Sequence, residues 1–209
     1  MGETPTFLAD PETTRESIMR ATYLALCEHG YAGLTIQRIG ESFEKSKSLL
    51  YHHYDDKDEL LLSFLEFMLE EHESSLPEDA ADGDAVERLD SLLDAMLAPS
   101  LSEEHRGFTA AMVELRAQAA TDERYREQFA EHDRAFHEQV VGIVEDGVES
   151  GRFRDVDAGQ VAEFVGTAVA GAMTRRVTGG GDATATATRG AIDDYVEGVL
   201  LADGADRQD

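Results

Sequence analysis

Residues 35–57 read TIQRIGESFEKSKSLLYHHYDDK and hold all three lysines of this 209-residue chain. Every other basic residue is an arginine, and the formal net charge is −26. A strongly acidic chain that places its few ammonium groups in one short segment favours an anionic partner at that segment. Duplex DNA is the first candidate, because its backbone carries a dense row of phosphates.

The same segment carries the start signals of consecutive helices. Thr35 and Ser46 are each suited to cap a short helix, because their hydroxyls can accept a hydrogen bond from a free backbone N–H. Asp56 and Glu59 stand three residues apart before an apolar run, which is typical of a capping box. The spacing predicts two short helices, after Thr35 and after Ser46, and a longer one that runs to about Ser74.

The rest of the chain also reads as helix after helix. A first helix is expected to start at Asp10-Pro11-Glu12 and to stop at Gly30. Apolar residues at helical spacing predict further helices near 84–98, 102–120, 122–150, 158–178 and 184–202, with an acidic loop over 77–83. The predicted fold class is all-α, with about nine helices. A three-helix helix-turn-helix domain, residues 11–58, precedes a larger helical domain, residues 59–202.

The outer face of the helix after Ser46 has the residue types of a DNA-reading element. A recognition helix needs small or polar residues at its N-terminal end to enter the major groove, and Ser48 meets that need. Leu49 could contact a thymine methyl group. Tyr51 and His52 can donate hydrogen bonds to phosphates, and Lys47 supplies positive charge beside them.

Flanking residues extend this candidate interface. Gln37 and Arg38 are placed to reach a base edge or a phosphate. Lys57 brings a positive charge next to the first backbone N–H groups of the longer helix. The predicted DNA-binding residues are Thr35, Gln37, Arg38, Ser46, Lys47, Ser48, Leu49, Tyr51, His52 and Lys57.

Several residues of the segment also have a purely structural interpretation. Arg38 could pair with Glu41 or Glu44 on the surface. Ser46 is a helix cap before it is a phosphate donor. Tyr54 is expected in the core, and a DNA contact by Lys45 stays open.

The segment and its surroundings resemble the DNA-binding domain of the TetR family of transcriptional regulators over residues 13–60. The resemblance is carried jointly by Gly30-Tyr31, Leu34-Thr35, Ile39-Gly40, Ser46-Lys47, Leu50-Tyr51-His52-His53-Tyr54 and Lys57-Asp58-Glu59-Leu60. Two positions depart from the family pattern, with Glu44 where glycine is usual and Lys45 where an apolar residue is usual. The resemblance implies a homodimeric regulator, expected to be a repressor on a palindromic operator and to be released by a small-molecule effector.

In the resembling family the effector pocket lies among the middle helices. The corresponding candidates are Met96, Phe108, Met112, Arg116, Phe129, His132 and Phe136. The simpler interpretation of each is plain core, but a site lined by aromatic and methionine side chains would suit an apolar or amphipathic effector.

The last two helices differ in kind from the others. Residues 161–173 are apolar nearly all round and rich in small side chains, so a helix there must be buried on several sides. The resemblance implies that the last two helices pair with those of a second subunit. The alternative is that they are buried within a single chain.

Composition narrows the remaining function classes. The chain lacks a run of about 18 apolar residues and the pattern of a signal peptide, so we expect no membrane span and a cytoplasmic location. It has no motif for catalysis, a metal or a cofactor, so we expect neither an enzyme nor a cofactor. The acidity and scarcity of lysine favour a halophilic protein. The alternative function is a helical bundle that binds a small molecule or a protein but not DNA.

Overall fold

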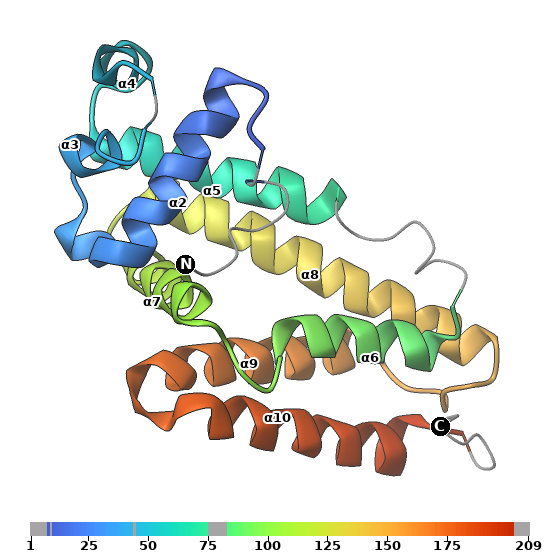
Figure 1. Ribbon diagram of the computed structural model, residues 1–209. Coiled ribbons are helices and arrows are strands. Elements are labelled where there is room, and N and C mark those ends of the chain that lie inside the picture. Colours follow the sequence, from blue (N-terminus) through green and yellow to red (C-terminus); the bar gives the residue numbers. More distant parts are fainter. Residues whose placement is uncertain (1–7, 9, 44, 75–82, 203–209) are drawn as a thin grey trace. The chain divides into compact units, whose positions relative to one another are not determined.

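The computed structural model describes residue 8 and residues 10–43, 45–74 and 83–202 (Figure 1). These residues form helices, turns and one isolated bridge between Phe153 and Leu201, which confirms the all-α prediction. The chain packs as two compact units. Unit 1 holds Met1–Ser75 with Leu101–Ala130, and unit 2 holds Leu76–Ser100 with Glu131–Asp209.

These units are divided differently from the predicted domains, residues 11–58 and 59–202. Helix α7, Glu103–Gln118, and the start of α8, Glu123–Glu149, belong to the same compact unit as the N-terminal helices. The predicted boundary separates functions rather than packing units, and it stays a prediction.

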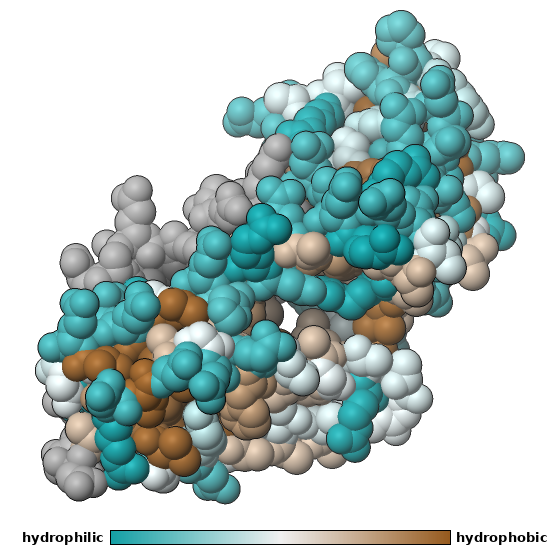
Figure 2. Space-filling view, turned by 180° about the vertical axis from the view of Figure 1, so that it is seen from behind, coloured by the Kyte–Doolittle hydropathy of each residue, from teal (hydrophilic) through white to brown (hydrophobic). Residues whose placement is uncertain are grey.

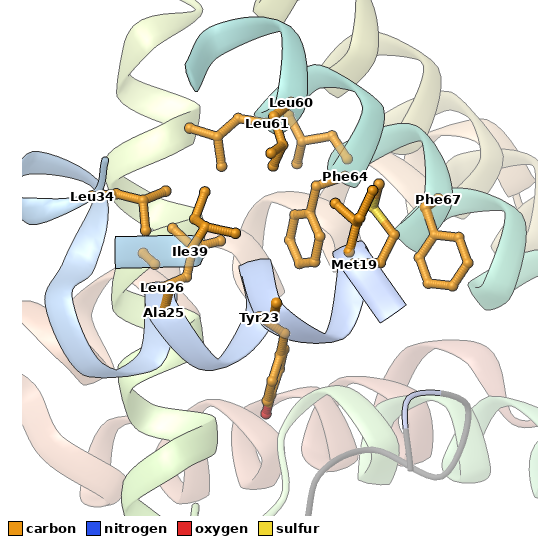
Figure 3. Packing of buried hydrophobic residues seen from close by; sticks show 14 of the residues in the cluster. Met19, Tyr23, Ala25, Leu26, Leu34, Ile39, Leu60, Leu61, Phe64 and Phe67 are labelled. Carbon is orange, nitrogen blue, oxygen red and sulfur yellow. The ribbon is translucent and has the colours of Figure 1, made fainter. Parts of the chain in front are cut away.

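Unit 1 is built on the crossing of α2, Thr14–Gly33, with α7. The two backbones approach so closely that a Cβ atom on Gly107 would lie 2.6 Å from the carbonyl oxygen of Cys27. A side chain at Gly107 would therefore push the helices apart. Figure 3 shows apolar side chains of α2 packed with those of the neighbouring helices, among them Met19, Leu26, Ile39, Leu61 and Phe64.

The helix-turn-helix consists of α3, Ile36–Ile39, and α4, Lys47–His53, followed by α5, Lys57–Ser74. Their starts are capped as the sequence predicts. The hydroxyl oxygen of Thr35 accepts a hydrogen bond from the backbone nitrogen of Arg38 at 3.2 Å, and that of Ser46 from Ser48 at 3.4 Å. A carboxylate oxygen of Asp56 accepts from the nitrogen of Glu59 at 2.9 Å.

The predicted start of the first helix at Asp10-Pro11-Glu12 is wrong. Helix α2 begins at Thr14, because the capping box is formed by Thr13 and Glu16 instead. The Thr13 hydroxyl accepts from the Glu16 nitrogen at 3.1 Å, and the Glu16 carboxylate accepts from the Thr13 nitrogen at 3.3 Å. The predicted stop is confirmed at Gly30, whose φ of 63° breaks the helical path.

Unit 2 holds α6, Ala85–Met96, the second part of α8, and the pair α9, Ala158–Arg175, and α10, Gly181–Tyr195. Both α9 and α10 end in a wider π-helical turn, Arg176–Gly180 and Val196–Leu200. The predicted glycine break between them is confirmed, with φ of 151° at Gly179 and 59° at Gly181. Most of the acidic loop predicted over 77–83 lies outside the described residues.

An arginine of α10 forms ion pairs that link α10 to α6. The guanidinium of Arg189 lies 2.9 Å from a carboxylate oxygen of Asp90 and 2.9 Å from one of Asp94, and it also contacts Asp193. Burial opposes the charge, but hydrogen bonds to Asp94 and Asp90 outweigh it and raise the pKa of Arg189. One cation therefore neutralises part of a cluster of three carboxylates.

Candidate nucleic-acid interface

Helix α4 turns the predicted DNA-reading residues outward. Leu50 is fully buried and anchors the helix on the core of unit 1. Lys47, Ser48 and His52 are exposed, and the Tyr51 side chain is 58% exposed. Because most of the Tyr51 side chain is not buried in the core, it is available to contact a partner.

Lys47 is held by its stem and free at its tip. A Cβ atom on Gly40 would lie 3.1 Å from Cγ of Lys47, so the aliphatic part of the lysine packs against the α3–α4 turn. The residue is nevertheless exposed, which leaves its ammonium group in solvent. The structure thus presents a positive charge at the N-terminal end of α4.

Other predicted contacts are partly committed to the fold. The hydroxyls of Thr35 and Ser46 serve as helix caps, and the Ser46 hydroxyl also lies 2.7 Å from that of Ser48. Leu49 is half-buried and packs against the core, so only part of it remains for DNA. Gln37 is exposed.

Two basic side chains turn back onto the protein. The guanidinium of Arg38 donates to the carbonyl oxygen of Gly33, which differs from the surface pair with Glu41 or Glu44 considered above. Glu44 lies outside the described residues. The ammonium of Lys45 lies 3.3 Å from the Thr14 hydroxyl at the start of α2, and the residue is exposed rather than laid over the core.

Lys57 rests on the aromatic ring of Tyr31, a contact that the sequence does not predict. Its ammonium lies 4.2 Å from the ring centroid of Tyr31, within cation–π range. Burial raises the pKa of Tyr31, and the nearby carboxylates of Asp58 and Asp122 add to the shift. The ring therefore stays neutral while it holds the cation.

Two residues from α7 and α8 reach the same region. A carboxylate oxygen of Glu114 accepts hydrogen bonds from the backbone nitrogens of Tyr31 at 2.7 Å and Ala32 at 3.3 Å. The Tyr125 hydroxyl donates to Asp58 at 3.4 Å, and burial followed by the Asp58 charge raises the pKa of Tyr125. No local sequence signal predicts these contacts. Glu114 lies 82 or more residues along the chain from its partners, and Tyr125 lies 67 residues from Asp58.

The candidate effector residues do not gather in one unit. Phe108, Met112, Arg116 and Phe129 belong to unit 1, whereas Met96, His132 and Phe136 belong to unit 2. In unit 1, Phe108 stacks on Tyr23 with centroids 4.9 Å apart, and the Arg116 guanidinium lies 4.5 Å from the Phe129 ring. In unit 2, Met96 and Phe136 pack against the core. Core packing accounts for these contacts, and the effector assignment stays a prediction.

Much of the exposed side of α9 and α10 is uncharged. Residues 164–174 and 183–188 contain no charged side chain, in a chain of net charge −26. Phe164 is 44% exposed and Val199 43% exposed, and Figure 2 shows hydrophobic surface concentrated on the part of the chain that holds these helices (lower left). A shallow groove of about 480 Å³ runs between α9 and α10. It is lined by Phe164, Ala168, Arg175, Ala183, Thr184, Ala187, Thr188, Ala191 and Ile192. None of the described helices has the length and apolarity needed to cross a bilayer.

Comparison with known families matches both parts of the chain. Residues 18–64, which include α3, α4 and the start of α5, match the model described as bacterial regulatory proteins of the tetR family. Residues 85–201 match the C-terminal domain of BetI-type transcriptional repressors. The chain belongs to the TetR family of transcriptional regulators. Its members are DNA-binding regulators rather than enzymes, and the resemblance seen in residues 13–60 is confirmed.

Similar proteins and similar solved structures match nearly the whole chain. The HTH-type transcriptional repressor AcnR of Corynebacterium glutamicum is 27% identical over 191 residues, which cover 91% of this chain and 94% of the repressor. A TetR transcription regulator from Haloarcula marismortui is 36% identical with a TM-score of 0.81, covering 90% of this chain and 98% of the regulator. A regulator from Saccharomonospora viridis, solved in complex with choline, shares the fold at 20% identity with a TM-score of 0.78, covering 90% and 97%.

Proposed function

We propose that this TetR-family chain is a cytoplasmic repressor that binds a palindromic DNA operator as a homodimer and is released by a small-molecule effector. The observation that carries the proposal is the exposed row of Lys47, Ser48, Tyr51 and His52 on α4, with Lys57 at the start of α5. In a helix-turn-helix protein this helix enters the major groove.

The roles within the row follow from chemistry and position. Ser48 stands at the N-terminal end of α4, where side chains meet base edges, and the exposed part of Leu49 suits a thymine methyl. Lys47, Tyr51 and His52 supply donors for phosphate oxygens, which position the protein without reading sequence. The ammonium of Lys57 stands beside the first backbone N–H groups of α5, a second place suited to a phosphate.

The homodimer is supported by the uncharged face of α9 and α10. Leaving such a face in solvent is unfavourable, and a second copy offers the same alanine-rich and glycine-rich surface for close helix packing. Two subunits related by a twofold axis would present two copies of α4 to half-sites about one helical turn, ~34 Å, apart.

The effector is proposed to be apolar or amphipathic, taken up by Met96, Phe108, Met112, Arg116, Phe129, His132 and Phe136. The support is the chemistry of these residues, together with the fact that TetR-family regulators commonly respond to small-molecule effectors. A halophilic setting is supported by the net charge of −26 and by the similarity to the Haloarcula regulator. In molar salt the Debye length is about 3 Å, which screens the self-repulsion of so acidic a chain.

Neutralising the two lysines separately tests DNA binding. DNA duplexes are first selected by the wild-type chain from a random-sequence pool, and affinities are then measured over a range of KCl concentrations. We expect Lys47→Gln and Lys57→Gln each to weaken binding by about fivefold and to lower the salt slope by about one, because each removes a phosphate contact. The control is Arg134→Gln, an equal charge change at an exposed position of α8 in unit 2, which should change affinity by less than about twofold.

The alternative, a helical bundle that binds a small molecule or a protein but not DNA, makes the opposite prediction. Under it the wild-type chain would select no duplex, or all three variants would bind alike. Circular dichroism of each variant establishes that the helical fold is retained.

A further inference from the structure

One carboxylate of α7 holds the end of α2. The φ of 63° at Gly30 interrupts α2, so the backbone N–H groups of Tyr31 and Ala32 begin a new helical turn without partners inside the helix. A single oxygen of Glu114 accepts from both, at 2.7 and 3.3 Å. A negative charge at the start of a helical turn is favourable, because the free N–H groups carry partial positive charge.

The ring of Tyr31 carries the ammonium of Lys57. The ammonium of Lys57 lies 4.2 Å from the ring centroid, and the residue is only half-buried. A lysine side chain has four flexible torsions, and a cation–π contact restricts them. Glu114 and Lys57 are therefore linked through Tyr31, one by its backbone and the other by its ring.

The helices around this link are fixed independently of it. Helix α7 lies close against α2 at Gly107, and α5 is tied to α8 by the hydrogen bond from Tyr125 to Asp58 at 3.4 Å. Loss of Glu114 should thus leave the start of α5 in place. What it removes is the constraint on the Tyr31 turn, and with it the position of the Lys57 ammonium.

We propose that Glu114 is a positioning residue for DNA binding, which acts through Tyr31 to hold the ammonium of Lys57 where a phosphate can meet it. The inference rests on the proposed function. It also links α7 to DNA affinity, since any displacement of this helix changes the position of the Glu114 carboxylate under the Tyr31 turn.

A double-mutant cycle between two residues that do not touch each other tests this path. The variants are Glu114→Ala, Lys57→Ala and both together, with affinity measured at one KCl concentration on a duplex selected by the wild-type chain. We expect Glu114→Ala to weaken binding by about fivefold, the scale of one charge-assisted contact. In the Lys57→Ala background the same substitution should change affinity by less than about twofold, because the group it positions is gone.

Two further variants separate positioning from charge and folding. Glu114→Gln keeps an oxygen that can accept from both amides, so it should bind DNA like the wild type. Glu127→Ala removes the same charge from an exposed position of α8 in unit 1 and should not weaken binding. If Glu114→Ala does not fold, Tyr31→Leu tests the same path, because it keeps the backbone amide and removes only the ring under Lys57.

The outcomes separate this inference from the proposed function. An equal loss from Glu114→Ala with and without Lys57 would show that Glu114 acts elsewhere and would overturn the inference. So would a folded Glu114→Ala or Tyr31→Leu variant with wild-type affinity. A wild-type chain that selects no duplex would instead refute the proposed function, and this inference with it.

Discussion

At the scale of single residues, Gly147 is a position where one added carbon atom would collide with the core. A Cβ atom on Gly147 would lie 2.1 Å from Cδ2 of Phe153, whose ring is buried in the core of unit 2. The ring cannot stay where it is if a methyl group is added, and forced repacking of a core costs about 1–3 kcal/mol. We therefore expect Gly147→Ala to lower the free energy of unfolding by about 2 kcal/mol, measured by denaturant titration in KCl.

The same helix supplies the control. Gly142 also lies on α8, and a Cβ atom there would meet nothing within 4 Å. Because alanine favours a helix interior over glycine, Gly142→Ala should stabilise the chain by about 0.5–1 kcal/mol. Equal effects of the two substitutions would show that helix propensity, and not the Phe153 contact, decides stability at Gly147.

The sequence predicts helix caps correctly where the capping side chain and its partner are close along the chain. Thr35, Ser46 and Asp56 cap their helices as predicted, because each cap involves a residue two or three positions away. The sequence does not predict the start of α2 correctly, because two capping patterns compete within a few residues and the box of Thr13 with Glu16 forms. The contact of Glu114 with Tyr31 could not be predicted, since it spans 83 residues and depends on the α2–α7 crossing.

At the scale of helices, the polar contact between α10 and α6 places one guanidinium among three carboxylates. The Arg189 side chain is 16% exposed, and its partners Asp90 and Asp193 are each 29% exposed. In Arg189→Gln the three acidic groups would face one another without that cation. We expect the free energy of unfolding to fall by about 2 kcal/mol in 0.1 M KCl and by clearly less in 2 M KCl, because salt screens the repulsion.

Thermal or denaturant unfolding at the two salt concentrations measures this difference. The matched control is Arg134→Gln, which makes the same change at an exposed position of α8. A deficit of Arg189→Gln that is equal at both salt concentrations would mean that lost packing, rather than repulsion among carboxylates, weakens the contact.

For whole helices, the sequence predicts the position along the chain but not the packing partners. Apolar spacing located the helices, and the structure confirms each long one within a few residues of its predicted range. The spacing does not say which helices pack together. Helix α7 packs against α2, so its apolar side chains help to build the core of unit 1, and Phe108 stacks on Tyr23. Such long-range packing has no signature in a single sequence.

At the scale of the whole molecule, the proposed homodimer makes the uncharged face of α9 and α10 the decisive surface. The Phe164 ring is 44% exposed and lies 4.7 Å from the Tyr195 ring, so it borders the groove between the two helices. In a dimer of standard size, such a central aromatic residue carries a large share of the binding energy. A carboxylate placed there would be buried in the subunit contact, which costs several kcal/mol without a partner cation.

We therefore expect Phe164→Glu to turn a wild-type dimer into a monomer at micromolar concentration, measured by sedimentation velocity. Its affinity for a palindromic duplex should fall by about 100-fold or more, because the second half-site no longer adds to the first. Ser91→Glu adds the same charge at an exposed position of α6 and should leave both properties unchanged. A Phe164→Glu variant that stays dimeric would place the subunit contact on another surface, whereas a monomeric variant with undiminished DNA affinity would show that one copy of α4 suffices for binding.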